Sequence, residues 1–476
     1  MNSEPLFFFF LVLDEMLRSG KLSSVSLTEF FLNRLETIGP LYNAVVTVSR
    51  EKSLVQARRS DEELAAGYDR GPLHGIPYGA KDILATSGGI PTSWGVACYR
   101  NRVFDYDATV IKNLERAGAV LAAKLAMVEL AGGMGYRQPY AACTGPGINP
   151  WDISTWSGGS SSGSGSAVCG GLVPFAVGSE TWGSIVTPAN NCGVSGLRPS
   201  YGTVSREGSM VISWTLDKLG PLALTAQDCG LVLEGMLSKS DENNNQATIV
   251  SKYRNNKIDK QSLRIAVPRG IADSSEPAVR ENFQQALEII RSFAKVEEVD
   301  LPDYPYPEIA RIILLAEASS AFEDFVEEGE LGGLTAPESR CGPFARIVIT
   351  ARDYLRALRV RTVAARHIGK FIEQWDAVVA PTRDTTATPL SEPIPSIIGG
   401  VAKDIVGAIG CIMGFPTVSV PSGFSEKNLP TGIQFMGKAN GEGIILSAAC
   451  QYQALTSWHL KHPEDPNPEL YSSNTS

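Results

Sequence analysis

Apolar positions recur along the chain at two spacings, and each spacing predicts a different kind of element. The helical period of 3.6 residues is clear in three segments, residues 14–66, 107–118 and 277–293. In the first segment Ser26 and Glu29 have the spacing of a capping box. Short apolar runs that predict buried strands occur at residues 119–125, 263–268, 377–382 and 417–424. A chain in which helices alternate with such strands belongs to the α/β class.

The N-terminal run LFFFFLVL, residues 6–13, is the most apolar stretch of the chain. It is too short for a spanning helix, which needs roughly 20 residues. Only Glu4 carries a charge before it, so the basic region of a signal peptide is missing. A buried first helix is the favoured interpretation, and an interfacial anchor is the alternative. No later stretch predicts a membrane span.

No linker separates the chain into halves, so a single domain over residues 1–476 is expected. Within it the predicted parts are a core at about 66–235 and 371–455, a helical cap at about 270–370, a polar surface segment at 238–248 and a loose tail at 463–476. The predicted fold is a large mixed, mostly parallel twisted sheet covered by helices on both faces.

Charge and cysteine content narrow the possible functions. With 42 basic and 51 acidic residues the net charge is −9, which argues against a protein that binds nucleic-acid phosphates. The eight cysteines form no C-x-x-C pair, and the four histidines are scattered. A cytoplasmic protein without a metal or other cofactor is therefore expected.

Residues 157–166 read SGGSSSGSGS and contain only serine and glycine. A flexible linker and a phosphate-binding loop are two interpretations, but apolar sequence follows directly and the lysine of a P-loop is missing. The remaining interpretation is a tight turn that displays hydroxyl groups. A second Gly/Ser element at 178–193 contains Ser184, and Lys81 lies in an apolar, glycine-flanked setting that would lower its pKa.

Two serine-bearing turns and a desolvated lysine suggest nucleophilic catalysis without histidine. A serine hydroxyl needs a base, and a neutral lysine can replace imidazole. His74 is the only histidine near these elements in sequence. The pattern by itself leaves a Ser/Lys hydrolase as one possibility among others.

A longer comparison of motifs is more specific. The segment GGSSSGSGSAVCGGLVPFAVGSETWGSIVTPANNCGVSGLRPS, residues 158–200, resembles the core motif of the amidase signature family. LHGIPYGAKDI lies upstream of it, and GFPTVSVPSG and LPTGIQFMG lie downstream in the family order. The resemblance runs from about residue 14 to 455 and implies the amidase signature fold.

The resemblance also implies roles for individual residues. Lys81 matches the general base, Ser160 the serine after a cis peptide bond, and Ser184 the nucleophile. The backbone N–H groups implied for the oxyanion hole are those of Thr181, Trp182, Gly183 and Ser184. Hydrophobic pocket residues are expected at Gly132, Gly133, Met134, Tyr136 and Trp182.

Four positions depart from the family pattern, and one of them is Ser162 in the first Gly/Ser turn. Glu180 replaces the usual aspartate and Val186 the usual arginine, so their internal ion pair is absent or Glu180 has another partner. Trp182 replaces a glycine, and tryptophan resists the positive φ that glycine tolerates. The three catalytic positions are unaffected.

Within the family the favoured function is a stand-alone amidase that also accepts carbamates, as a urethanase does, or ureas. Its expected partner is a small-molecule amide or carbamate, with no nucleic acid, no membrane span and a possible homodimer. The alternative is the A subunit of a tRNA-dependent amidotransferase, a glutaminase, for which Arg361 matches the arginine that holds the glutamine carboxylate. A non-catalytic protein on the same fold is the third hypothesis.

Overall fold

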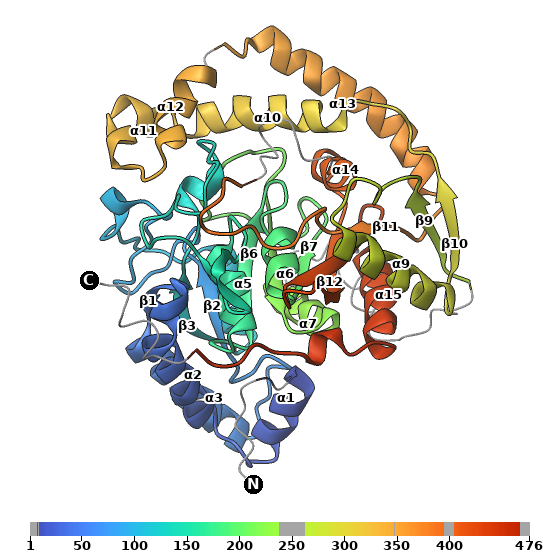
Figure 1. Ribbon diagram of the computed structural model, residues 1–476. Coiled ribbons are helices and arrows are strands. Elements are labelled where there is room, and N and C mark those ends of the chain that lie inside the picture. The colour runs from blue at the N-terminus through green and yellow to red at the C-terminus, as the bar shows by residue number, and fades with distance from the viewer. Residues whose placement is uncertain (1–6, 8, 238–261, 347, 395–403, 467–476) are drawn as a thin grey trace.

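An eleven-stranded mixed sheet runs through the computed structural model, which describes residues 7, 9–237, 262–346, 348–394 and 404–466 (Figure 1). In sheet order the strands are β1 (Val45–Val48), β3 (Val120–Leu125), β2 (Pro77–Lys81), β6 (Phe175–Glu180), β8 (Lys218–Ala223), β7 (Ser195–Arg198), β12 (Thr417–Phe424), β13 (Pro430–Met436), β11 (Ala377–Pro381), β9 (Arg264–Pro268) and β10 (Lys295–Val299). The polar segment 238–248 and residues 467–476 of the predicted tail lie outside the described residues.

Parallel pairs gather at two places in this sheet. Strand β2 is parallel to both β3 and β6, and β9 is parallel to both β11 and β10. The other six neighbouring pairs are antiparallel. The predicted mixed sheet is confirmed, and its parallel parts are the group of β3, β2 and β6 and the group of β11, β9 and β10.

Helices cover the sheet on both faces. They are α1 (Phe10–Arg18), α2 (Ser24–Thr37), α3 (Arg50–Ala65), α4 (Thr109–Arg116), α5 (Ser162–Cys169), α6 (Val186–Cys192), α7 (Ala226–Met236), α9 (Pro277–Arg291), α10 (Tyr306–Ala321), α11 (Glu323–Glu327), α12 (Pro337–Arg346), α13 (Ala351–Ile372), α14 (Ile405–Met413) and α15 (Glu442–Ala454).

Alternate residues of β6 show how the two faces are filled. Phe175 and Val177 pack in a cluster with residues of α1, α7 and α15, whereas Ala176 packs in a second cluster with residues of α5 and α6. Side chains of a strand alternate between its faces, so helices cover β6 on both sides. The buried, mainly apolar sequence of the strand follows from this arrangement.

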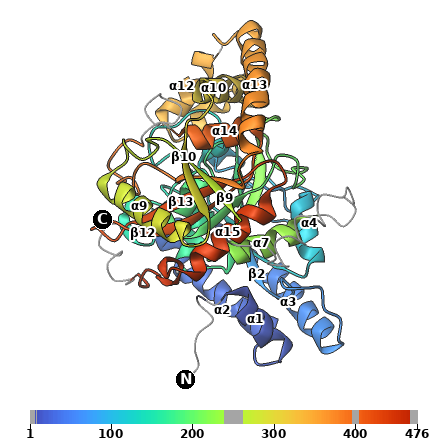
Figure 2. The ribbon, with the colours of Figure 1, turned by 90° about the vertical axis from the view of Figure 1, so that its right-hand side faces the viewer.

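Helices α10 and α13 lie across one end of the molecule, opposite to α1–α3 (Figures 1 and 2). They belong to the range 270–370 for which a helical cap was expected. The first part of that range is different, because β10 pairs with β9 at the sheet edge and α9 packs on the sheet. The helices that cross above the sheet begin at Tyr306.

Several predicted elements have the expected bounds. The run 417–424 forms β12, and 277–293 contains α9, whose stripe of Val279, Phe283, Leu287 and Ile290 is buried. The predicted capping box is wrong: α2 begins at Ser24, and the N-cap is Ser23, whose hydroxyl accepts the N–H of Ser26. Ser23, three residues before Ser26, has the same kind of side chain and takes the capping role instead.

The N-terminal apolar run contributes to α1 where the structure describes it. Phe10 and Leu13 are buried, and the Phe10 ring lies 5.4 Å from that of Phe175. Leu11 and Val12 on the other side are 52% and 41% exposed. Among the described residues, no helix combines the length and the apolar character that a membrane span requires.

Candidate active site

The carboxyl ends of the parallel strands β2 and β6 bring Lys81 and Ser179 together. Lys81 is the last residue of β2, and Ser179 stands one residue before the end of β6. Ala80 pairs with Val177 in the ladder, so Lys81 lies level with Gly178, one residue before Ser179. Polar groups at the carboxyl edge of such strands are the usual place for a binding site in α/β proteins.

The amine of Lys81 is fully buried among hydroxyl groups. Its Nζ lies 2.8 Å from Ser160 Oγ, 3.0 Å from Ser161 Oγ and 2.8 Å from Ser179 Oγ. Burial lowers the pKa of Lys81 from 10.5 to about 7, against the opposing effect of the Asp217 and Glu180 charges. A substantial fraction of the amine is therefore neutral near pH 7 and can accept a proton.

Two serine-bearing turns meet next to this lysine. Ser160 follows a cis peptide bond from Gly159 and lies just before α5. Ser184 lies just before α6. The N–H of Ser161 donates to the carbonyl oxygen of Ser184 over 3.3 Å, which holds the two turns against each other. The structure thus places Lys81, Ser160 and Ser184, the three residues singled out in the sequence, close to one another.

Ser184 is accessible in an otherwise sealed segment. From Thr155 to Ser200 every residue is buried except Ser184. The Gly/Ser composition permits this dense packing: a Cβ on Gly159 would lie 2.6 Å from the Trp156 ring and 3.0 Å from the Tyr136 hydroxyl. A reactant that enters from solvent therefore meets the hydroxyl of Ser184 first.

The loop that carries Ser184 has four free backbone donors. Among the described residues, no group accepts the N–H of Thr181, Trp182, Gly183 or Ser184. The loop adopts its left-handed conformation at Gly183, whose φ is +84°, while Trp182 is not among the residues with positive φ. The tryptophan therefore causes no backbone strain here, and the free N–H groups can receive a developing negative charge.

Glu180 and Arg198 form a buried ion pair that supports this loop. Glu180 Oε1 lies 2.6 Å from Arg198 Nη1, and both side chains are fully buried. Oε2 of the same carboxylate accepts the N–H groups of Ile185 and Val186. Burial opposes ionisation, but the charges of Arg198 and Lys218 lower the pKa of Glu180 below its ordinary value. Glu180 therefore has another partner in place of the arginine that Val186 replaces.

Asp82 and His74 belong to other contacts. The buried carboxylate of Asp82 accepts the N–H and O–H of Ser93 and forms an ion pair with Lys124 at 3.1 Å. His74 lies 3.1 Å from Glu63, far along the chain from the serine turns, and its pKa is lowered by burial. The base that contacts Ser160 is therefore Lys81.

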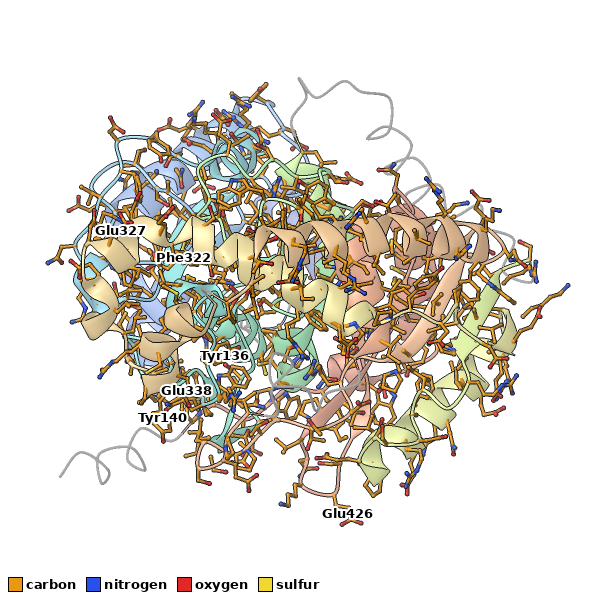
Figure 3. All side chains as sticks on the ribbon, turned by 90° about the horizontal axis from the view of Figure 1, so that it is seen from above. Tyr136, Tyr140, Phe322, Glu327, Glu338 and Glu426 are labelled. Carbon is orange, nitrogen blue, oxygen red and sulfur yellow. The ribbon has the colours of Figure 1, made fainter. Side chains whose placement is uncertain are left out.

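A pocket of about 90 Å³ opens at Ser184. Its lining comprises Ala131, Gly132, Gly133, Tyr136, Trp156, Gly159, Thr181, Trp182, Ser184, Thr187, Ile212, Leu314, Arg383 and Ile394. In the view from above, Tyr136 lies in the same half of the molecule as Phe322, the residue that follows α10 (Figure 3). The volume accommodates on the order of six to nine water-sized groups, as a small amide would need.

Four of the five expected pocket residues line this pocket, and Met134 does not. Its side chain is 1% exposed and packs in the large hydrophobic cluster. Its neighbours Gly133 and Tyr136 line the pocket, but the Met134 side chain points into the core, so sequence proximity alone was misleading. Arg361 on α13 is not among the pocket residues either.

The sequence analysis missed three polar residues of the site. Ser161 and Ser179 contact Lys81, and Arg383 lines the pocket. The available signal for Ser179 was its position two residues after the apolar run 175–177, since a polar residue at the end of a buried strand can reach a site. Arg383 gave no local signal: it follows β11 and is distant in sequence from the other elements.

Comparison with known proteins agrees with the geometry. The family model described as Amidase matches residues 26–446. The A subunit of glutamyl-tRNA(Gln) amidotransferase from Alkalilimnicola ehrlichii is 33% identical over 94% of this chain and 97% of its own length. The protein of the same name from Nitrosomonas europaea is 34% identical over 95% of this chain and 98% of its own.

Solved structures give the same fold. A vestigial protein complex linked to the origins of an s-triazine catabolic enzyme, with bound inhibitor, matches with a TM-score of 0.85 and 27% identity over 94% of this chain and 98% of that one. The peptide amidase of Stenotrophomonas maltophilia matches with a TM-score of 0.80 and 28% identity over 96% and 98%. The A subunit of glutamyl-tRNA(Gln) amidotransferase from Thermotoga maritima matches with a TM-score of 0.79 and 28% identity over 98% and 100%.

These relatives correct one expectation from the sequence. A small-molecule amide or carbamate substrate without any nucleic acid was expected, largely from the acidic net charge. The full-length relatives are instead named as one subunit of an enzyme of glutamyl-tRNA(Gln). Net charge is a property of the whole chain and says little about an assembly in which another subunit can bind the polyanion. The amidotransferase alternative fits these relatives better than the stand-alone amidase.

Proposed function

The chain belongs to the amidase family, and from this membership we propose that it is the amide-hydrolysing subunit of a tRNA-dependent amidotransferase. Its reaction is the hydrolysis of the side-chain amide of glutamine, which releases ammonia for transfer. Ser184 is the nucleophile, Ser160 relays the proton and Lys81 is the base.

Attack begins with a proton transfer along two hydroxyl groups. Neutral Lys81 takes the proton of Ser160 while Ser160 takes that of Ser184, so the oxygen of Ser184 can form a bond to the amide carbon. The distance of 2.8 Å from Lys81 Nζ to Ser160 Oγ supports the first transfer. The amine starts uncharged because burial has lowered its pKa to about 7.

The same groups serve the departure of ammonia. The C–N bond breaks as its nitrogen takes the proton of Ser160, and the Lys81 ammonium restores that proton. An acyl ester on Ser184 remains. Water then attacks the ester carbon, its proton passes through Ser160 to Lys81, and Ser184 regains its own proton when it leaves. Each residue ends in its initial state.

The tetrahedral intermediate carries a negative oxygen that needs donors. The free N–H groups of Thr181, Trp182, Gly183 and Ser184 surround the nucleophile and support this role. One donor of this kind typically lowers the activation barrier by about 3–4 kcal/mol. The donors are backbone groups, so Trp182 in place of glycine leaves them available.

One observation carries the proposal: a fully buried lysine contacts Ser160 beside the single accessible residue of a sealed segment, Ser184. The choice of glutamine as the substrate and of tRNA as the downstream partner is supported by the full-length relatives named above.

The test compares the purified chain alone with the chain co-purified with the other amidotransferase subunits of its source. Ammonia release from glutamine is measured with and without Glu-tRNA(Gln). We expect release to depend on the other subunits, and Ser184→Ala to lower kcat by at least about 10⁴-fold. Ser154→Ala, at an exposed serine of the neighbouring hairpin β4 (Ile148–Asn149) and β5 (Asp152–Trp156), is the control.

Two results would contradict the proposal in different ways. Rapid hydrolysis of anilides or aryl carbamates by the chain alone, with no glutamine hydrolysis in the complex, would reject the amidotransferase function. Labelling by a serine-directed fluorophosphonate that survives in Ser184→Ala would reject the nucleophile.

A further inference from the structure

The pocket at Ser184 contains one charged side chain among its described lining residues, that of Arg383. The other lining side chains are apolar, aromatic or hydroxyl-bearing. A guanidinium is costly to keep in such a place unless an anion balances it. The proposed reaction at Ser184 needs no cation there, because the amide is neutral and backbone N–H groups receive the oxyanion.

The nearest anion binds Arg383 only loosely. Nη1 of Arg383 lies 3.8 Å from Asp404 Oδ2, beyond hydrogen-bond distance, and the arginine side chain is 13% exposed. This Nη1 is buried and donates no hydrogen bond to any described group. A buried donor without a partner is rare in folded proteins and often marks a ligand position.

Asp404 is already occupied by other donors. Its Oδ2 accepts the Nε1–H of Trp182 over 3.2 Å, and its Oδ1 accepts the N–H of Gly407 over 2.9 Å at the start of α14. The same carboxylate therefore orients the tryptophan wall and caps a helix. No described group accepts a hydrogen bond from Arg383, so its donors are available to the pocket that it lines.

From this geometry we infer that Arg383 binds a carboxylate of the substrate, so that the enzyme selects small amides that carry a carboxylate. A guanidinium presents paired N–H groups that match the two oxygens of a carboxylate. The inference rests on the proposed function, and it deepens that function, since glutamine carries a carboxylate at the end remote from its side-chain amide.

The inference assigns the carboxylate-binding role to Arg383 in place of Arg361. Arg361 was matched to the carboxylate position, but it lies on α13 and outside the pocket lining, whereas Arg383 and Ser184 share one pocket. Arg383 follows β11, so the binding group comes from a different element of the fold.

Kinetics of matched variants can test this assignment. Arg383→Met keeps an unbranched apolar stem but removes the guanidinium and its charge, Arg383→Lys keeps the charge, and Arg361→Met tests the competing arginine. The ratio of kcat/KM for glutamine to kcat/KM for pentanamide, which lacks the carboxylate, is measured in the full complex. We expect Arg383→Met to lower this ratio by about 10- to 100-fold, mainly through KM, and Arg383→Lys to lower it less.

A binding experiment gives a readout without turnover. In the Ser184→Ala background, calorimetric titration with glutamine should show a dissociation constant raised by the same factor in Arg383→Met, while thermal unfolding monitors the fold. Equal losses on glutamine and pentanamide would show a structural role and overturn the inference. A ratio lowered by Arg361→Met but not by Arg383→Met would also overturn it.

The same variants separate this inference from the proposed function. Succinamate, a small amide with a carboxylate and no α-amine, is offered to the chain alone. If glutamine is not a substrate but Arg383→Met selectively loses succinamate hydrolysis, the carboxylate assignment stands and the amidotransferase function fails. If glutamine is hydrolysed and Arg383→Met leaves the ratio unchanged, the function stands and the assignment fails.

Discussion

Glu180 and Arg198 form a buried ion pair of 2.6 Å directly beneath the loop that carries Ser184. The carboxylate also holds the N–H groups of Ile185 and Val186, so one side chain links the sheet to the start of α6. The loop geometry thus depends on a charge pair that never reaches the pocket.

We predict that Arg198→Met lowers the free energy of unfolding by about 3–5 kcal/mol, because it leaves the Glu180 carboxylate buried without its cation. Chemical denaturation measures this change. Arg269→Met is the control: Arg269 is 59% exposed in its ion pairs with Glu298 and Asp300, and its removal should change stability by less than about 0.5 kcal/mol. Equal effects of the two substitutions would show that the buried pair does not stabilise the fold.

The pH dependence of turnover should follow Lys81. Since the pKa of this amine is lowered to about 7, kcat should fall as the pH drops below about 7 and the base becomes protonated. Lys81→Met should abolish turnover at every pH. A pH–rate profile with no acidic limb between pH 6 and 8 would contradict the assignment of Lys81 as the base.

The same lysine links pH to stability. In the unfolded chain its pKa returns to about 10.5, so between about pH 7 and 10.5 the unfolded state binds more protons than the folded state. The contribution of Lys81 to stability is therefore complete above about 10.5 and is lost as the pH falls toward 7. Denaturant midpoints measured across this window should rise less steeply with pH in Lys81→Met than in the wild type.

Ser179→Ala should shift the acidic limb of the rate profile to lower pH. The hydroxyl of Ser179, 2.8 Å from Lys81 Nζ, can accept a hydrogen bond from the charged amine, whereas a methyl group in its place cannot. Loss of this hydrogen bond disfavours the ammonium form of Lys81 and lowers the pKa of Lys81 further. Thr109→Ala, a hydroxyl removed from the start of α4, controls for general effects. A limb that moves to higher pH would contradict this account.

Trp182→Ala should enlarge the pocket and change selectivity. The indole is 7% exposed, lines the pocket and donates to Asp404. We expect kcat/KM for bulky amides to rise by at least about tenfold relative to glutamine, with a loss of about 3 kcal/mol in stability. Trp182→Phe keeps most of the volume, so it should lose stability without the change in selectivity. Identical selectivity in the alanine variant and the wild type would show that the Trp182 indole does not determine which amides enter the pocket.

The sequence predicted best what depends on local order along the chain. Apolar runs located strands such as β12, and the spacing between Ser160 and Ser184 placed both in the family motif. The first residues of helices were predicted less accurately. Ser26 was expected as the cap of α2 but Ser23 is the N-cap, since neighbouring serines have equal capping ability. The pairing of β10 with β9 could not be read from the sequence, because β10 is a partly exposed edge strand whose sequence KVEEV has no apolar run.

The site was predicted to the extent that its members carry a recognisable motif. Lys81 and the two serines do, whereas Arg383 acts through its position in space and carries no motif. Met134 shows the opposite error, in which closeness along the chain suggested a contact that the fold directs into the core.

The sealed stretch from Thr155 to Ser200 supplies only part of the pocket lining. The stretch contains both serines of the proton relay, while Tyr136, Leu314, Arg383 and Ile394 come from outside it. Substitutions at these outer lining positions can therefore accumulate over evolution without disturbing the groups that break the bond. Descendants of one ancestral hydrolase can in this way acquire different substrate specificities while they keep the same catalytic chemistry.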